Sequence, residues 1–118
     1  MAYDDVLAGR VRAVLGGVPA LNEIRMFGGL CFTIHGNMAV GITADDLMVR
    51  MGEDQAEAAL DEPHVRPMDF TGRPMRGFVF VEPEATRDDD GLRTWVRRGV
   101  SFASALPPKA PRKGKPRT

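Results

Sequence analysis

The sequence has one cysteine among its 118 residues, so no disulfide can form within a single chain. This residue, Cys31, lies in the apolar run GLCFTI, a setting that favours a small buried thiol over a reactive one. The sequence also lacks any run of about eighteen apolar residues, the length that a membrane-spanning helix needs. Its first residues, MAYDDVLAGRVRAV, do not have the basic-then-apolar order of a secretory signal. We therefore expect a soluble, cytoplasmic protein that does not associate with membranes.

Lysine is absent from the first 108 residues, and all three lysines lie in the final segment PPKAPRKGKPRT. This segment, residues 107–118, carries five basic residues and no acidic one. Residues 1–106 hold eleven arginines against sixteen acidic residues, which gives them a net charge of −5. Because the final segment is polar and rich in proline, we predict one folded domain over residues 1–106 and a disordered basic tail over residues 107–118. Such a tail would bind nucleic acid at most weakly and without sequence preference.

Three segments have the hydrophobic spacing of helices. Asp4 and Asp5 precede apolar residues at helical spacing from residue 6 to residue 15, and a glycine pair then ends the pattern. A second, short helix is predicted over residues 52–60, whose acidic residues lie in the first turn, where the helix dipole favours negative charge. Three consecutive aspartates at residues 88–90 predict the start of a third helix, which ends before Pro107.

The other apolar segments have the composition and the period of two that are typical of strands. The connections between them are short enough for hairpins, with turns predicted at Gly36 and Asn37 and at Ala44 and Asp45. Pro67 predicts that its strand lies at a sheet edge or begins late, because proline donates no backbone hydrogen bond. The predicted strands are residues 23–29, 30–35, 38–43, 46–51, 65–70 and 75–81.

The order of these elements, α-β(3-4)-α-β(2)-α, predicts a two-layer α+β fold. We expect an antiparallel β-sheet of five to six strands with helices on one face. A parallel architecture is disfavoured because the connections are too short for crossovers.

The sequence contains no recognisable motif for a metal or a cofactor. Its glycine-containing segments do not match the phosphate-binding patterns that open a helix, and Cys31, His35 and His64 lack the paired spacing of structural zinc sites. The aspartates of residues 45–46 and 88–90 are explained by a turn and a helix start, and no nucleophile lies near a base in the sequence. We therefore predict no metal and no cofactor, and we name no catalytic residue.

Three arginines, Arg25, Arg73 and Arg76, are the most informative polar group. A guanidinium can bind a carboxylate or a phosphate in a forked geometry that other side chains do not offer. The simpler interpretation is that these arginines lie at the surface and pair with the acidic body of the protein. Gly28 and Gly29 are interpreted as a bulge or as a close approach between backbone segments.

The segments RMFGGLCF, GNMAVG, DLMVR, MDFTGRPMRGFVFV and SFASALPPK together resemble the TfoX N-terminal domain family, which is related to the Sxy competence regulators of bacteria. The resemblance extends from about residue 8 to residue 109. It implies an α+β domain that is similar in outline to type III secretion chaperones and is commonly a dimer. It implies no catalytic residue. Longer members carry a second, C-terminal helical domain, which we do not expect in this 118-residue chain.

The resemblance predicts a non-enzymatic binding module that acts in regulation through protein–protein contacts, with a possible partner in transcriptional regulation. The alternative is a small enzyme or ligand-binding protein with a site near Arg25, Arg73 and Arg76. The candidate binding residues are Arg25, Phe27, Gly28, Gly29, Arg73 and Arg76.

The segment MRGFVFV is apolar in both of its alternating sets, Phe78 with Phe80 and Val79 with Val81. A strand of this kind is predicted to be buried on both faces, and three helices are too few to cover a sheet of five or six strands twice. We therefore predict a homodimer formed across the sheet. Phe78 or Phe80 would lie near the contact, with Arg73 and Arg76 at its rim.

Overall fold

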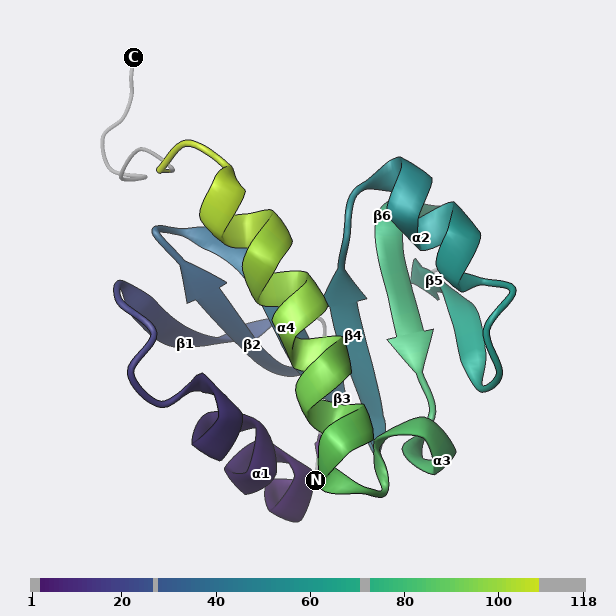
Figure 1. The fold of residues 1–118 in the computed structure, drawn as a ribbon, viewed down its shortest axis with the longest axis horizontal. Coiled ribbons are helices and arrows are strands. Elements are labelled where there is room, and N and C mark those ends of the chain that lie inside the picture. The colour runs from purple at the N-terminus through teal and green to yellow at the C-terminus, as the bar shows by residue number, and fades with distance from the viewer. Residues whose placement is uncertain (1–2, 27, 71–72, 109–118) are drawn as a thin grey trace.

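The computed structural model describes residues 3–26, 28–70 and 73–108, which form one antiparallel sheet and a layer of helices (Figure 1). The helices are α1 (Asp5–Leu15), α2 (Glu53–Ala59), α3 (Pro83–Thr86) and α4 (Asp89–Ala105). The strands are β1 (Leu21–Met26), β2 (Gly29–Ile34), β3 (Asn37–Thr43), β4 (Asp46–Arg50), β5 (Val65–Phe70) and β6 (Arg73–Val81).

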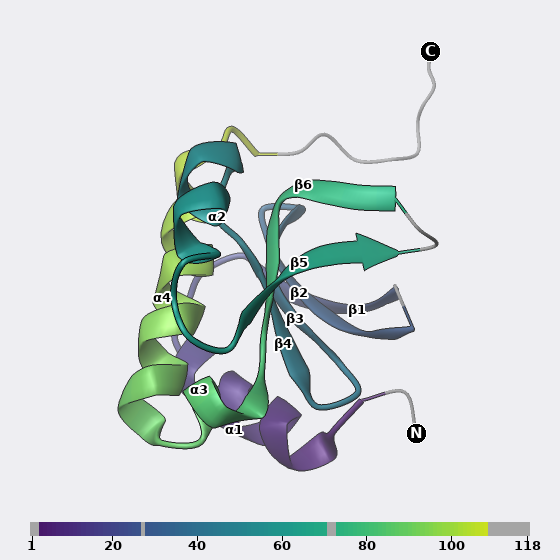
Figure 2. The ribbon, with the colours of Figure 1, turned by 90° about the vertical axis from the view of Figure 1, so that its right-hand side faces the viewer.

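The six strands lie in the order β1-β2-β3-β4-β6-β5, and every neighbouring pair is antiparallel. The helices lie together on one side of this sheet (Figure 2). This arrangement confirms the predicted two-layer α+β fold with an antiparallel sheet. It also confirms the position predicted from Pro67, since β5 is one of the two edge strands and β1 is the other.

The two longest helices begin at aspartates, as the sequence predicts. The carboxylate of Asp4 accepts hydrogen bonds from the backbone N–H groups of Val6 and Leu7, at 2.9 and 3.2 Å. Asp88 caps α4 in the same way by accepting a bond from the N–H of Gly91. These carboxylates satisfy N–H groups that have no partner within the helix and lie where the helix dipole favours negative charge. Val6 lies outside the buried stripe of α1 and is 74% exposed.

Two local features differ from the sequence-based expectation. The turn between β2 and β3 consists of His35 and Gly36, whose φ angles are 51° and 81°, whereas Gly36 and Asn37 were predicted. Positive φ at both central residues is what a two-residue hairpin turn of the favoured type needs, and Asn37 consequently starts β3. The four-residue helix α3 was not predicted, because it is too short to show helical spacing.

The main core lies between the helices and one face of the sheet. Helix α4 crosses β2, β3 and β4 and contributes the single tryptophan, Trp95, to this core. Val79 and Val81 point to this face, as one of the two alternating sets of β6. The larger buried residues of this core are Leu7, Val11, Leu15, Leu30, Phe32, Val40, Ile42, Leu47, Val49, Met51, Val79, Val81, Leu92, Trp95 and Val96.

The opposite face of the sheet carries a second buried group, the methionine cluster, formed by Cys31, Met38, Met48, Met68 and Phe80 with Met75 and Phe78 packed against it. The pairing of β5 with β6 shifts register between Pro67 and Asp69, and Gly77 has a φ of 86°. The hairpin bends at this irregularity and extends away from the helices, as Figure 2 shows. The bend brings Met68 into the methionine cluster and Met75 against it.

This bend changes the reasoning that led to the homodimer. Phe80 is only 7% exposed in a single chain, so it needs no second chain to be buried, whereas Phe78 remains partly exposed. Of the two residues named for the contact, Phe78 is therefore the one that a partner chain can reach. The homodimer stays a prediction.

The start of the predicted tail contacts the domain. The amide of Asn37, a residue that is 9% exposed, donates a hydrogen bond to the backbone oxygen of Pro107 at 2.9 Å. The five basic residues of the tail lie in residues 109–118, outside the described part of the chain.

Candidate functional surfaces

The arginines that were named as candidate binding residues lie on different parts of the sheet. Arg25 is exposed on the edge strand β1, while Arg76 is exposed on β6, and three strands separate β1 from β6. Arg76 forms an ion pair with Glu53 of α2, with Nη1 and Oε1 3.6 Å apart. Phe27 and the side chain of Arg73 lie outside the described residues. No interaction between described residues joins Arg25 to Arg76, so a shared site for these two side chains stays a prediction.

The two glycines of the candidate set have backbone roles. Gly28 has a φ of 69°, a conformation that side chains other than glycine rarely adopt. Gly29 lies so close to β3 that an added Cβ would overlap the backbone oxygen of Ile42. These observations match the interpretation of the pair as a turn with a close backbone approach.

A polar group that the sequence did not reveal is centred on Arg66 of β5. Its guanidinium donates hydrogen bonds to Glu82, at 2.8 Å, and to Asp46 of β4, and it lies 4.9 Å from the ring centre of Phe80. Burial, with smaller contributions from the neighbouring carboxylates, raises the pKa of Asp46, although the guanidinium of Arg66 acts in the opposite direction. Arg66 thus links three strands at the end of the sheet. Its partners are 16 to 20 residues away in the sequence, too far for local patterns to identify.

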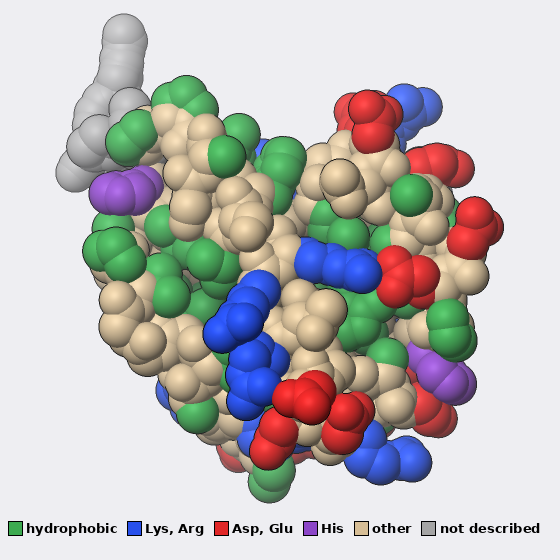
Figure 3. All heavy atoms as spheres, viewed as in Figure 1, with side chains coloured by type: hydrophobic (Ala, Val, Ile, Leu, Met, Phe, Trp, Pro, Cys, Tyr) green, Lys and Arg blue, Asp and Glu red, His purple; other side chains and the backbone are tan. Residues whose placement is uncertain are grey.

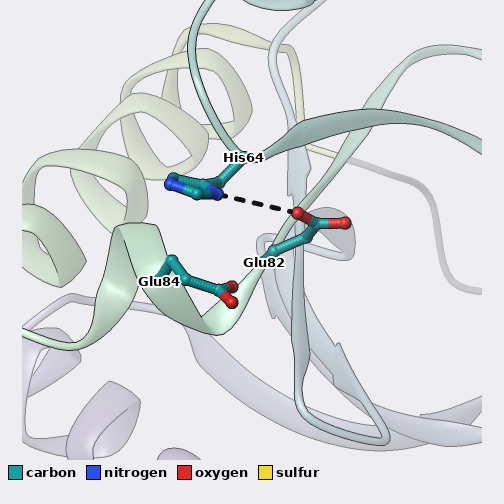
Figure 4. A group of neighbouring side chains, drawn as sticks. All are labelled: His64, Glu82 and Glu84. Carbon is teal, nitrogen blue, oxygen red and sulfur yellow. Dashed lines mark ion pairs between the residues drawn. The ribbon is translucent and has the colours of Figure 1, made fainter.

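His64, Glu82 and Glu84 form the one described group of three side chains with the types and spacing that a metal ion needs (Figure 4). One ligand atom from each lies within 4.8 Å of the others, and His64 Nδ1 is 3.8 Å from Glu82 Oε1. Glu82 already accepts the hydrogen bond from Arg66, so a cation here would lie beside a guanidinium. From the sequence, His64 was grouped with Cys31 and His35 as a possible ligand, but Cys31 lies in the methionine cluster and His35 lies in an exposed turn. The absence of a bound metal stays a prediction.

The thiol of Cys31 is buried, as the apolar run around it predicts. Burial raises the pKa of Cys31 to about 11. Because the thiolate is the nucleophile, this cysteine is unsuited to catalysis at neutral pH.

The edge strand β1 is regular and exposed. All six of its residues pair with β2 in one continuous register, from Leu21 with Ile34 to Met26 with Gly29. Residues 22–25 are exposed, and Ile24 is 42% exposed. Arg12 of α1 holds the strand in place by donating two hydrogen bonds to Glu23, at 2.8 and 2.9 Å. The hydrogen bond lowers the pKa of Glu23.

A groove of about 500 Å³ lies between α2 and α4 on the helical side of the molecule. Its floor is apolar, with Met51 before α2 and Phe102 on α4. Polar side chains line its walls. They are Gln55 from α2 and Thr94, Arg97, Arg98 and Ser101 from α4. Figure 3 shows this hollow between the two helices, with cationic side chains over α4 and across the groove. This groove was not predicted from the sequence.

None of the helices in the described part of the chain has both the length and the apolar character that a membrane span requires. No curated protein and no solved structure matches the chain. The model of the TfoX N-terminal domain family matches residues 13–103, which include every strand, the C-terminal end of α1 and most of α4. The chain therefore belongs to the TfoX N-terminal domain family.

Proposed function

We propose that this protein is a non-enzymatic binding module that acts in regulation, and that an extended segment of a partner protein pairs with the outer edge of β1. Membership of the TfoX N-terminal domain family suggests a regulatory or competence-related domain. The family alone is a weak basis for a mechanism, because one fold can serve many functions. The proposal therefore depends on a feature of the sheet.

The observation that carries the proposal is the difference between the two edges of the sheet. β5 contains Pro67, its pairing with β6 is interrupted, and its Arg66 is engaged by two carboxylates. These are features by which proteins prevent a further strand from adding to an edge. β1 contains no proline and pairs with β2 without a shift in register, and no described strand pairs with its outer side. An added strand can therefore form a regular ladder there.

Ile24 gives this edge an apolar contact point. Among the described residues, Ile24 and Val6 are the only large hydrophobic side chains that are exposed. Ile24 pairs with Cys31 of the methionine cluster, so a partner strand beside it would extend the apolar surface of that face. Burying the exposed part of an isoleucine contributes up to about 1 kcal/mol, and backbone hydrogen bonds supply orientation.

The groups that catalysis would need are not assembled in the described part of the chain. The thiol of Cys31 is buried and its pKa is about 11. Ser101 and Ser104 are exposed on α4, and neither is hydrogen-bonded to a described histidine or carboxylate. This supports a binding role over an enzymatic one.

The test uses two variants that each add a negative charge at an exposed apolar position. Tagged wild-type protein, Ile24→Glu and the control Val6→Glu are used to capture partners from the cells that make the protein. We expect partners to be retained by wild type and Val6→Glu and reduced at least tenfold by Ile24→Glu. Hydrogen exchange on the reconstituted complex should then show protection of the amides of Leu21–Met26. A partner that Ile24→Glu still binds, with β1 unprotected, would show that recognition occurs on another surface.

A further inference from the structure

The arginines of this protein differ in whether an acidic side chain neutralises them. Six arginines form an ion pair with a described carboxylate. They are Arg10, Arg12, Arg66, Arg76, Arg93 and Arg98. Among the described residues, Arg25, Arg50, Arg87 and Arg97 have no such partner. Two of these four, Arg50 and Arg97, lie at the groove between α2 and α4.

The groove is consequently positive within a domain that is negative overall. Arg97 lines it directly, and Arg50 contacts one of its lining residues, since the guanidinium carbon of Arg50 is 5.3 Å from the ring centre of Phe102. Arg98 also lines the groove, but it donates two hydrogen bonds to Glu62, at 2.8 and 3.4 Å, which balance its charge. Among the residues that the structure describes, no acidic side chain lines the groove. By contrast, residues 1–106 have a net charge of −5. A charge of one sign inside a concave surface attracts ligands of the other sign.

The polar side chains at the groove are available to a ligand. Thr94 is already engaged, since its hydroxyl donates to the backbone oxygen of Asp90 at 2.9 Å. Ser101 and Gln55 form no side-chain hydrogen bond with any described residue, and the same is true of Arg97. Residues 97 and 101 are one turn apart on α4, so Arg97 and Ser101 project from the same side of the helix. Gln55 approaches from α2 on the other wall.

We propose that the groove between α2 and α4 binds a small amphipathic organic anion. The anionic group, a carboxylate, sulfonate or phosphate, is held by Arg97 with the hydroxyl of Ser101 and the amide of Gln55. The apolar part of the ligand lies on Met51 and Phe102. A volume of about 500 Å³ is within the usual range of small-molecule sites, which also combine an apolar lining with a few polar groups. This site does not involve β1 and is independent of the proposed function.

Arg98 has a positioning role in this arrangement. The guanidinium carbon of Arg98 lies 4.3 Å from the ring centre of Trp95 on α4. The same guanidinium donates hydrogen bonds to Glu62, which follows α2. This bridge connects the two walls of the groove and sets their separation. Arg97 has no comparable restraint from a described residue, so its guanidinium is available to a ligand in the groove.

The experiment uses the dye anilinonaphthalene sulfonate as the probe, because it combines a sulfonate with aromatic rings and fluoresces when it enters an apolar site. The wild-type chain is titrated with the dye, alongside Arg97→Glu and Arg97→Gln. The control is Arg87→Glu, which makes the same charge change at an exposed arginine that also lacks a described acidic partner. We expect saturable binding to wild type and Arg87→Glu. Arg97→Glu should weaken it at least tenfold, and Arg97→Gln by a smaller factor.

Two further measurements separate this site from nonspecific dye binding. Circular dichroism must show unchanged unfolding for the variants, because partly unfolded proteins also bind the dye. Amide shifts in NMR spectra should then change at Gln55, Ser101 and Phe102 and not along β1. Equal loss in Arg97→Glu and Arg87→Glu, shifts that lie elsewhere, or no binding at millimolar dye would each overturn the proposal.

Discussion

Gly99 is a point of close contact between α4 and the sheet. A Cβ at this position would lie 2.5 Å from the backbone oxygen of Ala39 and 2.7 Å from Cγ1 of Val40. Both atoms belong to β3, which lies inside the sheet, so the backbone oxygen cannot move without disturbing its neighbours. Glycine is unfavourable in the middle of a helix, and its presence here is explained by this contact.

The substitution Gly99→Ala sets two opposing effects against each other. Alanine favours the helix by about 1 kcal/mol relative to glycine. Overpacking of a tightly fitted core costs about 1–3 kcal/mol, and the contact with a backbone oxygen places this site toward the upper end. We therefore expect Gly99→Ala to lower the free energy of unfolding by about 1–2 kcal/mol. This is a considerable part of the stability of a domain, which is typically about 5–15 kcal/mol.

Gly9 of α1 provides the matched control. It is also inside a helix, but an added Cβ there would meet no atom within 4 Å. Gly9→Ala should therefore raise the free energy of unfolding by about 0.5–1 kcal/mol. Urea unfolding followed by far-UV circular dichroism measures both values, and unchanged m-values would show that the unfolded states are comparable. If Gly99→Ala is as stable as wild type while Gly9→Ala gains stability, α4 does not pack on β3 at the distance described.

Further predictions concern the thiol, one ion pair, assembly and the tail. Cys31 should not react with a thiol reagent at pH 8 in the native protein and should react fully after unfolding, since its pKa is about 11; fast native reaction would show an accessible thiol. The hydrogen bond from Arg12 lowers the pKa of Glu23 below its ordinary value of 4.5. The ion pair therefore stabilises the folded state above pH 4.5, and this contribution is lost as the pH falls through the lowered pKa. Glu23→Gln should thus cost less than about 1 kcal/mol at pH 7, as expected of an exposed pair, and nothing in strong acid, and urea unfolding at the two pH values checks this. Light scattering should give the mass of a homodimer, and Phe78→Glu should shift it toward the monomer; a monomeric wild type would contradict the prediction. Deletion of residues 109–118 should abolish any DNA binding and leave thermal unfolding unchanged, whereas binding that persists would indicate a folded DNA-binding surface.

The sequence predicted the parts of the fold that depend on local chemistry. Asp4 and Asp88 mark helix starts because a carboxylate there satisfies free N–H groups, and this requirement does not depend on the rest of the structure. The two alternating sets of β6 also behaved as predicted. Val79 and Val81 face the helices, while Phe80 lies in the methionine cluster on the other face. Such patterns can be read directly because a strand alternates its side chains wherever it is placed.

The bend of the β5–β6 hairpin could not be predicted in the same way. Gly77 and Pro67 indicate an irregularity, but neither specifies the direction in which the hairpin turns. The direction determines whether the methionine cluster is covered by the same chain. From the sequence, three helices were too few to cover both faces of the sheet, and the second apolar side of β6 was therefore assigned to a second chain. The bent sheet buries much of that surface without one.

The candidate arginines show why a binding site is harder to predict than a fold. In the sequence, Arg76 appeared informative because it lies beside a turn and an apolar strand, whereas nothing in the sequence distinguished Arg97 from the other arginines. The structure reverses this order, because Arg76 is paired with Glu53, while Arg97 has no described acidic partner and lines a concave surface. Whether an arginine is neutralised depends on acidic residues that are distant in the sequence. Glu62 lies 36 residues from Arg98, and without that pair a second arginine of the groove lining would have no acidic partner. The anion-binding proposal for Arg97 therefore follows from the pairing of its neighbours, which only the assembled fold determines.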